Sequence, residues 1–89
     1  MKIEHINWND EDITHIARHG IEPGEVEDIF FSGKPVTIKV KNKRYLTMSQ
    51  TSQGRYLIVI SEYLGYNRAG IITARPMSDA ERKLYQKRR

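Results

Sequence analysis

Histidines are the first side chains to consider for chemistry, because imidazole titrates near neutrality without help from its surroundings. His15 and His19 stand four residues apart, so a helix places both on one face. That spacing also suits two metal ligands, but no third ligand and no glutamate-bearing zinc motif accompany it, so we expect no metal and no cofactor. His19, directly before Gly20, is interpreted either as a proton-transfer residue or as a helix C-terminal cap. We expect His5 to pack rather than react.

Arginine is the second residue type that could take part in chemistry, because a guanidinium group can bind a phosphate through two parallel hydrogen bonds. Short turns on either side of a strand over residues 55–63 predict that Arg55 and Arg75 meet at one end of a sheet. Such a pair could bind a phosphodiester and stabilise the charge of a phosphoryl transition state. The alternative is that each arginine pairs with a nearby carboxylate, such as Glu81 for Arg75.

The charge distribution indicates a polyanionic partner. The formal net charge is +4 at pH 7, but residues 1–33 carry two basic and eight acidic side chains, whereas residues 34–89 carry thirteen basic and three acidic ones. Phosphates are the usual ligands of clustered Lys and Arg, which favours nucleic acid over the alternative of a merely solvated surface. The predicted RNA-binding residues in the basic part are Lys41, Lys43, Arg68 and Lys83, with Arg44 as a further contact.

Composition restricts the class of protein. The 89 residues suffice for one domain, residues 1–89, with one small core. The absence of cysteine excludes disulfides, cysteine zinc sites and thiol nucleophiles. The longest apolar run, residues 57–60, is far shorter than the roughly 20 residues that span a bilayer. Without a basic and then apolar leader, the chain is expected to be cytoplasmic, with no membrane partner.

Three helices are predicted from capping residues and apolar spacing. An asparagine cap opens the first, Pro23 stands in the first turn of the second, and a Ser-x-x-Glu capping box opens the third. Glycines end the first two. The predicted helices lie between Asn9 and Gly20, between Pro23 and Gly33, and from Ser78 onward.

Alternating apolar residues predict the strands of an antiparallel meander. A weak strand is predicted over residues 2–7, and the stronger ones over residues 36–40, 45–50, 55–63 and 68–75. The resulting order is β-α-α-β-β-β-β-α, an α+β fold with helices on one face of the sheet.

A set of residues spread over positions 8–85 has a familiar order and spacing. It comprises Trp8, residues 18–21, 25–27, 44–45, 54–57 and 71–75, and Met77, Glu81 and Tyr85. In these positions the chain resembles the BrnT family of bacterial type II toxins, small ribonucleases with a RelE-like fold.

The resemblance implies a metal-independent endoribonuclease that inhibits translation by orienting a ribose 2′-hydroxyl of mRNA, free or on the ribosome, for attack on the adjacent phosphate. It assigns charge stabilisation to Arg55 and Arg75, a further contact to Arg44 and proton transfer to His19. It also implies a DNA-binding antitoxin protein as partner. Two other functions stay open: a non-catalytic RNA- or ribosome-binding module of the same fold, and a domain that binds only another protein.

Overall fold

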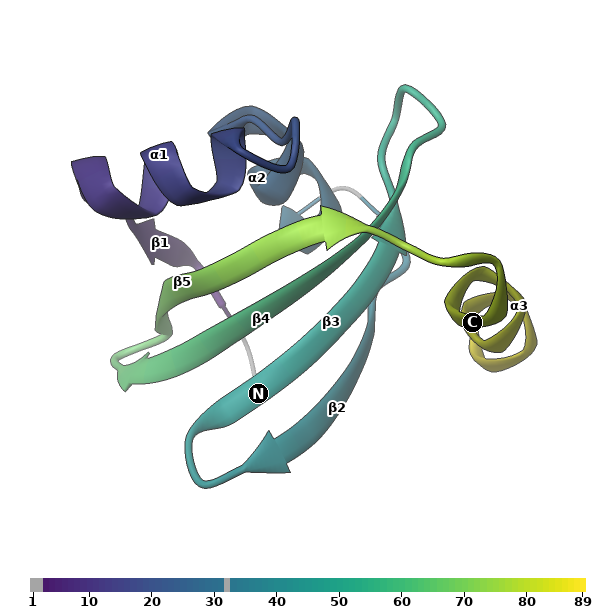
Figure 1. The fold of residues 1–89 in the computed structure, drawn as a ribbon. Coiled ribbons are helices and arrows are strands. Elements are labelled where there is room, and N and C mark those ends of the chain that lie inside the picture. The colour runs from purple at the N-terminus through teal and green to yellow at the C-terminus, as the bar shows by residue number, and fades with distance from the viewer. Residues whose placement is uncertain (1–2, 32) are drawn as a thin grey trace.

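The computed structural model describes residues 3–31 and 33–89, and over these residues it is an α+β fold with one five-stranded mixed sheet and three helices (Figure 1). The predicted order of elements is confirmed. The elements are β1 (His5–Asn7), α1 (Asp10–Ala17), α2 (Pro23–Phe31), β2 (Val36–Lys41), β3 (Arg44–Gln50), β4 (Tyr56–Gly65), β5 (Arg68–Pro76) and α3 (Asp79–Arg88). The strand predicted over 2–7 is thus shorter, and its first residue, Lys2, lies outside the described residues.

The sheet has the strand order β1-β5-β4-β3-β2. Strands β2 to β5 form the predicted antiparallel meander, because short turns can join only antiparallel neighbours. The first strand differs from that pattern: β1 pairs in parallel with β5, with Ile6 opposite Ala69. The segment that separates β1 from β5 in sequence, including α1 and α2, supplies the long crossover that a parallel pair requires.

Helices α1 and α2 cover one face of the sheet. Ile16 of α1 and Val26 and Ile29 of α2 are fully buried against Leu57 and Val59 of β4. These two strand residues are two positions apart, so their side chains point to the same face. This cluster holds α1 against β5 and thereby sets the position of the histidines.

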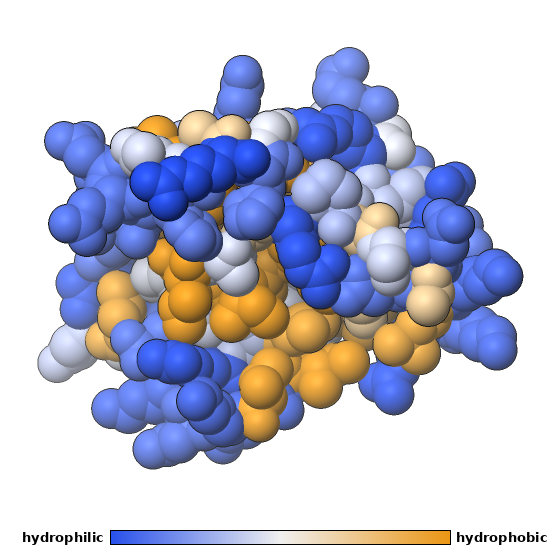
Figure 2. Space-filling view, in the orientation of Figure 1, coloured by the Kyte–Doolittle hydropathy of each residue, from blue (hydrophilic) through white to orange (hydrophobic). Residues whose placement is uncertain are grey.

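Helix α3 packs on the opposite face, so the prediction that all helices cover one face is wrong. Tyr85 of α3 is buried with Met48 of β3 and Ile58 of β4. Strand β4 is apolar on both faces, and burying both therefore requires a helix on each side. Figure 2 shows hydrophobic side chains between polar ones across the middle of this face of the molecule.

The predicted helix ends are confirmed by their hydrogen bonds. Asn9 Oδ1 accepts from the Asp12 backbone N–H at 2.8 Å and caps α1. Gly20 has a φ of +74°, which suits glycine and turns the chain away from that helix. Ser78 and Glu81 form the capping box of α3. Within the described residues, no helix has the length and apolar character needed to cross a membrane.

Candidate functional site

His15 reaches from α1 onto the sheet. Its neighbour Ile16 is fully buried and anchors the helix, so the His15 ring lies over β5. His15 Nε2 lies 3.1 Å from Thr73 Oγ1 in a partly buried hydrogen bond, which fixes the orientation of the imidazole ring. Thr73 was not among the predicted site residues, because this contact joins positions far apart in the sequence.

His19 lies beside His15, as the four-residue spacing predicts. The two rings meet edge to face, with their centroids 5.6 Å apart. Helix α1 ends at Ala17, and the turn at Gly20 leaves His19 exposed. Among the described residues, no group of three or more His, Asp and Glu side chains is placed to hold a metal ion.

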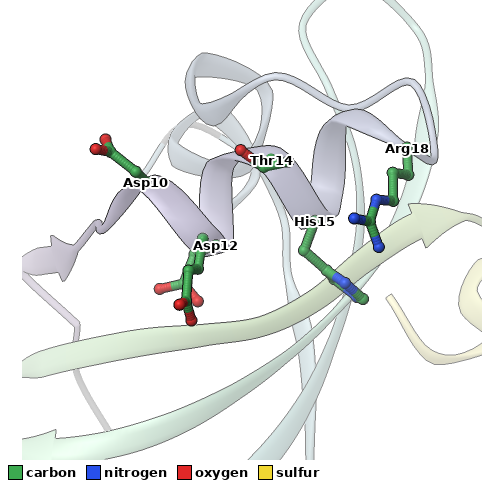
Figure 3. Close-up of a pocket in the computed structure, with 6 residues that line it drawn as sticks. Asp10, Asp12, Thr14, His15 and Arg18 are labelled. Carbon is green, nitrogen blue, oxygen red and sulfur yellow. The ribbon is translucent and has the colours of Figure 1, made fainter.

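An open groove of about 490 Å³ runs along α1. Its lining residues are Asp10, Glu11, Asp12, Thr14, His15 and Arg18. Figure 3 shows His15 and Arg18 pointing toward β5, with Asp12 farther toward the start of the helix. The groove is therefore acidic near the start of α1, whereas Arg18 and the His15 imidazole lie near its end.

Arg55 lies on the face of the sheet that α1 and α2 cover. Its Nη1 donates to both carboxylate oxygens of Glu25, at 2.7 and 2.9 Å, and to the Gly20 carbonyl oxygen at 3.1 Å. The guanidinium thus touches the turn that follows His19. Its charge is balanced by the Glu25 carboxylate rather than left for a phosphate.

Arg75 forms a bidentate ion pair of its own. Nη1 and Nη2 donate to the two carboxylate oxygens of Glu81, each at 2.7 Å. These hydrogen bonds from Arg75 lower the pKa of Glu81 to about 2, and the Glu81 carboxylate raises the pKa of Arg75. This is the carboxylate pairing that the sequence offered as the alternative to phosphate binding.

The prediction that Arg55 and Arg75 meet is wrong. Arg75 lies opposite Ile58, whose side chain faces α3, whereas the four-residue turn expected over 64–67 would place it beside Tyr56 and Arg55. Arg55 is two positions before Leu57, whose side chain faces α1 and α2. Since successive strand residues point to opposite faces, the two guanidinium groups lie on opposite sides of the sheet. The register differs from the prediction because the turn between β4 and β5 has two residues, not four.

We call the end of the sheet where β4 begins the helix end, and the end where β4 runs into its turn the hairpin end. Four of the predicted RNA contacts gather at the hairpin end: Lys41, Lys43, Arg44 and Arg68. Arg44 lies opposite Glu62 of β4. Within the part of the chain that the structure describes, none of these four cations forms an ion pair.

Helix α3 adds a further basic surface at the helix end. The guanidinium carbon of Arg82 lies 4.2 Å from the centroid of the Tyr56 ring, and Gln86 Nε2 donates to the Tyr56 hydroxyl at 3.4 Å. The hydrogen bond from Gln86 and the charge of Arg82 lower the pKa of Tyr56. Lys83, a predicted RNA contact, is exposed on the same helix.

The sequence reasoning missed Arg18 as a site residue and gave His15 only a metal-binding alternative. The available signal was local: His15, Arg18 and His19 fall within five residues of one helix end. The partner of His15 on β5 carries no such signal, because only the packing of α1 on the sheet brings Thr73 close.

No protein-family model, curated protein or solved structure matches the chain.

Proposed function

We propose that this protein is an endoribonuclease toxin of a type II toxin–antitoxin system, with the RelE-like character that its sequence resemblance implies. It would cleave RNA without a metal ion, through a ribose 2′-hydroxyl. The observation that carries the proposal is the pair of imidazoles, His15 and His19, whose ring centroids lie 5.6 Å apart, with His15 and Arg18 lining the α1 groove. This cluster replaces the pair of arginines expected from the sequence as the centre of the chemistry.

Each of the two imidazoles carries out one of the two proton transfers of the reaction. One, neutral, accepts the 2′-hydroxyl proton as the O2′–P bond forms, and the other, protonated, donates to the 5′-oxygen as the P–O5′ bond breaks. The products are a 2′,3′-cyclic phosphate and a 5′-hydroxyl. The Arg18 guanidinium stabilises the negative charge on the phosphoryl oxygens in the transition state.

Arg55 acts in this scheme as a positioning residue. Its hydrogen bonds to Glu25 and to the Gly20 carbonyl fix the turn after His19. Arg75 stabilises the start of α3 through Glu81. Neither guanidinium contacts the groove in this arrangement, because both are engaged with carboxylates.

The test is RNA cleavage by the purified chain in buffer with EDTA, with and without ribosomes. We expect fragments that end in 2′,3′-cyclic phosphate, identified by their resistance to 3′-end labelling until the cyclic phosphate is opened and the resulting phosphate is removed. RNA that stays intact in both conditions would contradict the nuclease proposal.

A non-catalytic RNA-binding module is the second candidate, and the basic surface of α3 favours it. Arg82 lies over the Tyr56 ring and Lys83 is exposed beside it. Salt-sensitive binding of RNA that remains uncut would support this function. If the chain neither binds nor cleaves RNA, the result would support the third function, a domain that binds only another protein.

The toxin proposal includes a DNA-binding antitoxin as the protein partner. Such a partner would cover the basic surface and block access of RNA to it. Co-purification with the product of the adjacent reading frame, together with loss of RNA binding in the complex, is the expected result.

A further inference from the structure

The turn between β4 and β5 holds a tyrosine in an unfavourable conformation. Tyr66 and Asn67 have φ angles of 53° and 59°, the pattern of a type I′ turn, which favours asparagine and glycine. A bulky side chain is rarely found there, because its Cβ crowds the backbone. The Tyr66 ring is 90% exposed, so packing inside the protein does not compensate for this choice.

The turn is rigidly held despite its exposure. The Asn67 backbone N–H donates to the Tyr63 hydroxyl at 3.1 Å. The Asn67 carbonyl oxygen accepts from the backbone N–H groups of Glu4 and His5, at 2.8 and 3.2 Å. These bonds tie the turn to β1 and to β4, so the Tyr66 ring stands on a fixed support. A fixed exposed ring loses little entropy when a flat ligand stacks on it.

One cation lies beside this ring, and three more share the hairpin end of the sheet. The Arg68 guanidinium carbon lies 5.8 Å from the Tyr66 ring centroid, and Arg68 Nε donates to the Gly65 carbonyl at 3.4 Å. The two hairpin turns are joined, since the Tyr63 backbone N–H donates to the Lys43 carbonyl at 2.7 Å. Figure 1 shows both turns at the end of the sheet away from α3.

A hollow of about 370 Å³ lies beside the two hairpin turns. It is lined by Lys43, Glu62, Tyr63, Leu64 and Gly65. Glu62 lines the hollow, and Glu4 Oε1 accepts from Asn67 Nδ2 at 3.3 Å, so two carboxylates lie near the four cations of the hairpin end and the local charge stays positive. The combination of an exposed ring with surrounding cations is the arrangement that binds unpaired nucleotides.

We propose that Tyr66, Arg68 and Lys43 form a subsite for one unpaired nucleotide of single-stranded RNA. The base stacks on the exposed ring of Tyr66, and the cations bind the adjoining phosphates. Stacking of this kind tolerates every base, but requires a base that is not covered by duplex neighbours. This inference rests on the proposed RNA function and adds the substrate class.

The subsite and the His15 part of the α1 groove are separated along β5. His15 contacts Thr73, which is five residues from Arg68 on that strand, about 17 Å at roughly 3.3 Å per residue. A stacked strand advances about 3.4 Å per nucleotide, which makes the separation about five nucleotides. An RNA of about three nucleotides therefore reaches one site, whereas an RNA of about 15 nucleotides reaches both.

The test compares variants of Tyr66 on a labelled single strand of about 15 nucleotides with 2′-O-methyl riboses, which cannot be cleaved through the 2′-oxygen. We expect Tyr66→Asn to weaken binding about 5- to 100-fold, the range for loss of one base–aromatic stack. Tyr66→Phe should bind like the parent chain. Tyr66→Asn should also keep or raise the melting temperature, because asparagine suits the turn. Phe31→Asn, the same change on an exposed ring of α2, should leave RNA affinity unchanged.

Two results would overturn the subsite: unchanged single-strand affinity in Tyr66→Asn, or equal weakening for duplex RNA. If the variant binds RNA normally but loses an antitoxin, the ring is a protein contact and the subsite is also overturned. The proposed nuclease fails separately. If the parent chain leaves natural RNA intact but Tyr66→Asn weakens RNA binding, the nuclease proposal is refuted and the subsite is retained. If the parent chain cleaves RNA but Tyr66→Asn binds it with unchanged affinity, the subsite is refuted and the nuclease proposal is retained.

Discussion

The two ends of the sheet use their positive charges in different ways. At the helix end, Arg55 and Arg75 are each bound to a carboxylate, and the groups left open to a groove are His15 and Arg18. At the hairpin end, the cations have no ion pairs within the described residues, and the exposed Tyr66 ring lies beside one of them, Arg68.

This difference shows that a count of arginines does not locate a phosphate site. A guanidinium bound to a carboxylate stabilises the fold and offers little charge to a ligand. Cations without such partners remain free to bind phosphate, and their contribution depends on salt. We infer that the helix end performs the chemistry and that the hairpin end holds the substrate.

The largest expected effect is on catalysis at the helix end. His15→Gln and His19→Gln should each lower kcat about 10²- to 10⁴-fold, because each removes a proton-transfer group, with KM nearly unchanged. Steady-state cleavage of a labelled RNA measures both constants. His5→Gln, an exposed histidine on β1, is the control and should retain full activity. An effect of His5→Gln as large as that of His15→Gln would contradict the assignment.

Arg55→Ala and Arg68→Ala are expected to change different quantities: the first lowers stability, and the second weakens RNA binding. Loss of the Arg55 contacts should cost about 1 kcal/mol, the upper range for an exposed ion pair, and lower the Tm by about 4–8 °C. Arg68→Ala should leave the Tm nearly unchanged and weaken binding to all RNA sequences alike. Thermal melts and anisotropy titrations measure the two quantities. If Arg55→Ala instead weakens binding at an unchanged Tm, Arg55 contacts phosphate.

The Arg75–Glu81 pair predicts a pH dependence of stability. The pKa of Glu81 is about 2 in the folded chain, below its ordinary value of 4.5, so its contribution is complete above pH 4.5 and is lost as the pH falls toward 2. Glu81→Gln should remove this part of the pH dependence. Urea unfolding across that window measures it, with Asp79→Asn in the same first turn of α3 as the control. Identical pH profiles for the parent and Glu81→Gln would refute the prediction.

The smallest expected effect is on the salt dependence of binding. Lys43→Gln should reduce the slope of log K against log salt for single-stranded RNA by about 0.7, the value for one lost phosphate contact. Lys34→Gln, an exposed lysine outside the hairpin end, should leave the slope unchanged. Equal slopes for Lys43→Gln and Lys34→Gln would show that no RNA phosphate contacts Lys43.

Much of the fold could be predicted, because its signals are local. The Asn9 cap, the αL glycine at Gly20 and the capping box at Ser78 each depend on a few neighbouring residues, and all three are confirmed. The strand meander follows from short turns between alternating segments. The parallel β1 was not predicted, because its partner β5 lies about sixty residues away and pairing across that distance leaves no local pattern.

The candidate site was predicted less well, for a physical reason. In a strand, side-chain direction has a period of two and facing residues depend on the turn, so a turn shorter by two residues moved Arg75 from Tyr56 to Ile58. The His15–His19 pair was accessible, because four-residue spacing on a helix is local. The sequence alone determined which elements form, where the helices begin and end, and how the charges divide along the chain. Only the tertiary structure decided which cations are bound to carboxylates and which face solvent, because those contacts depend on register and packing between distant segments.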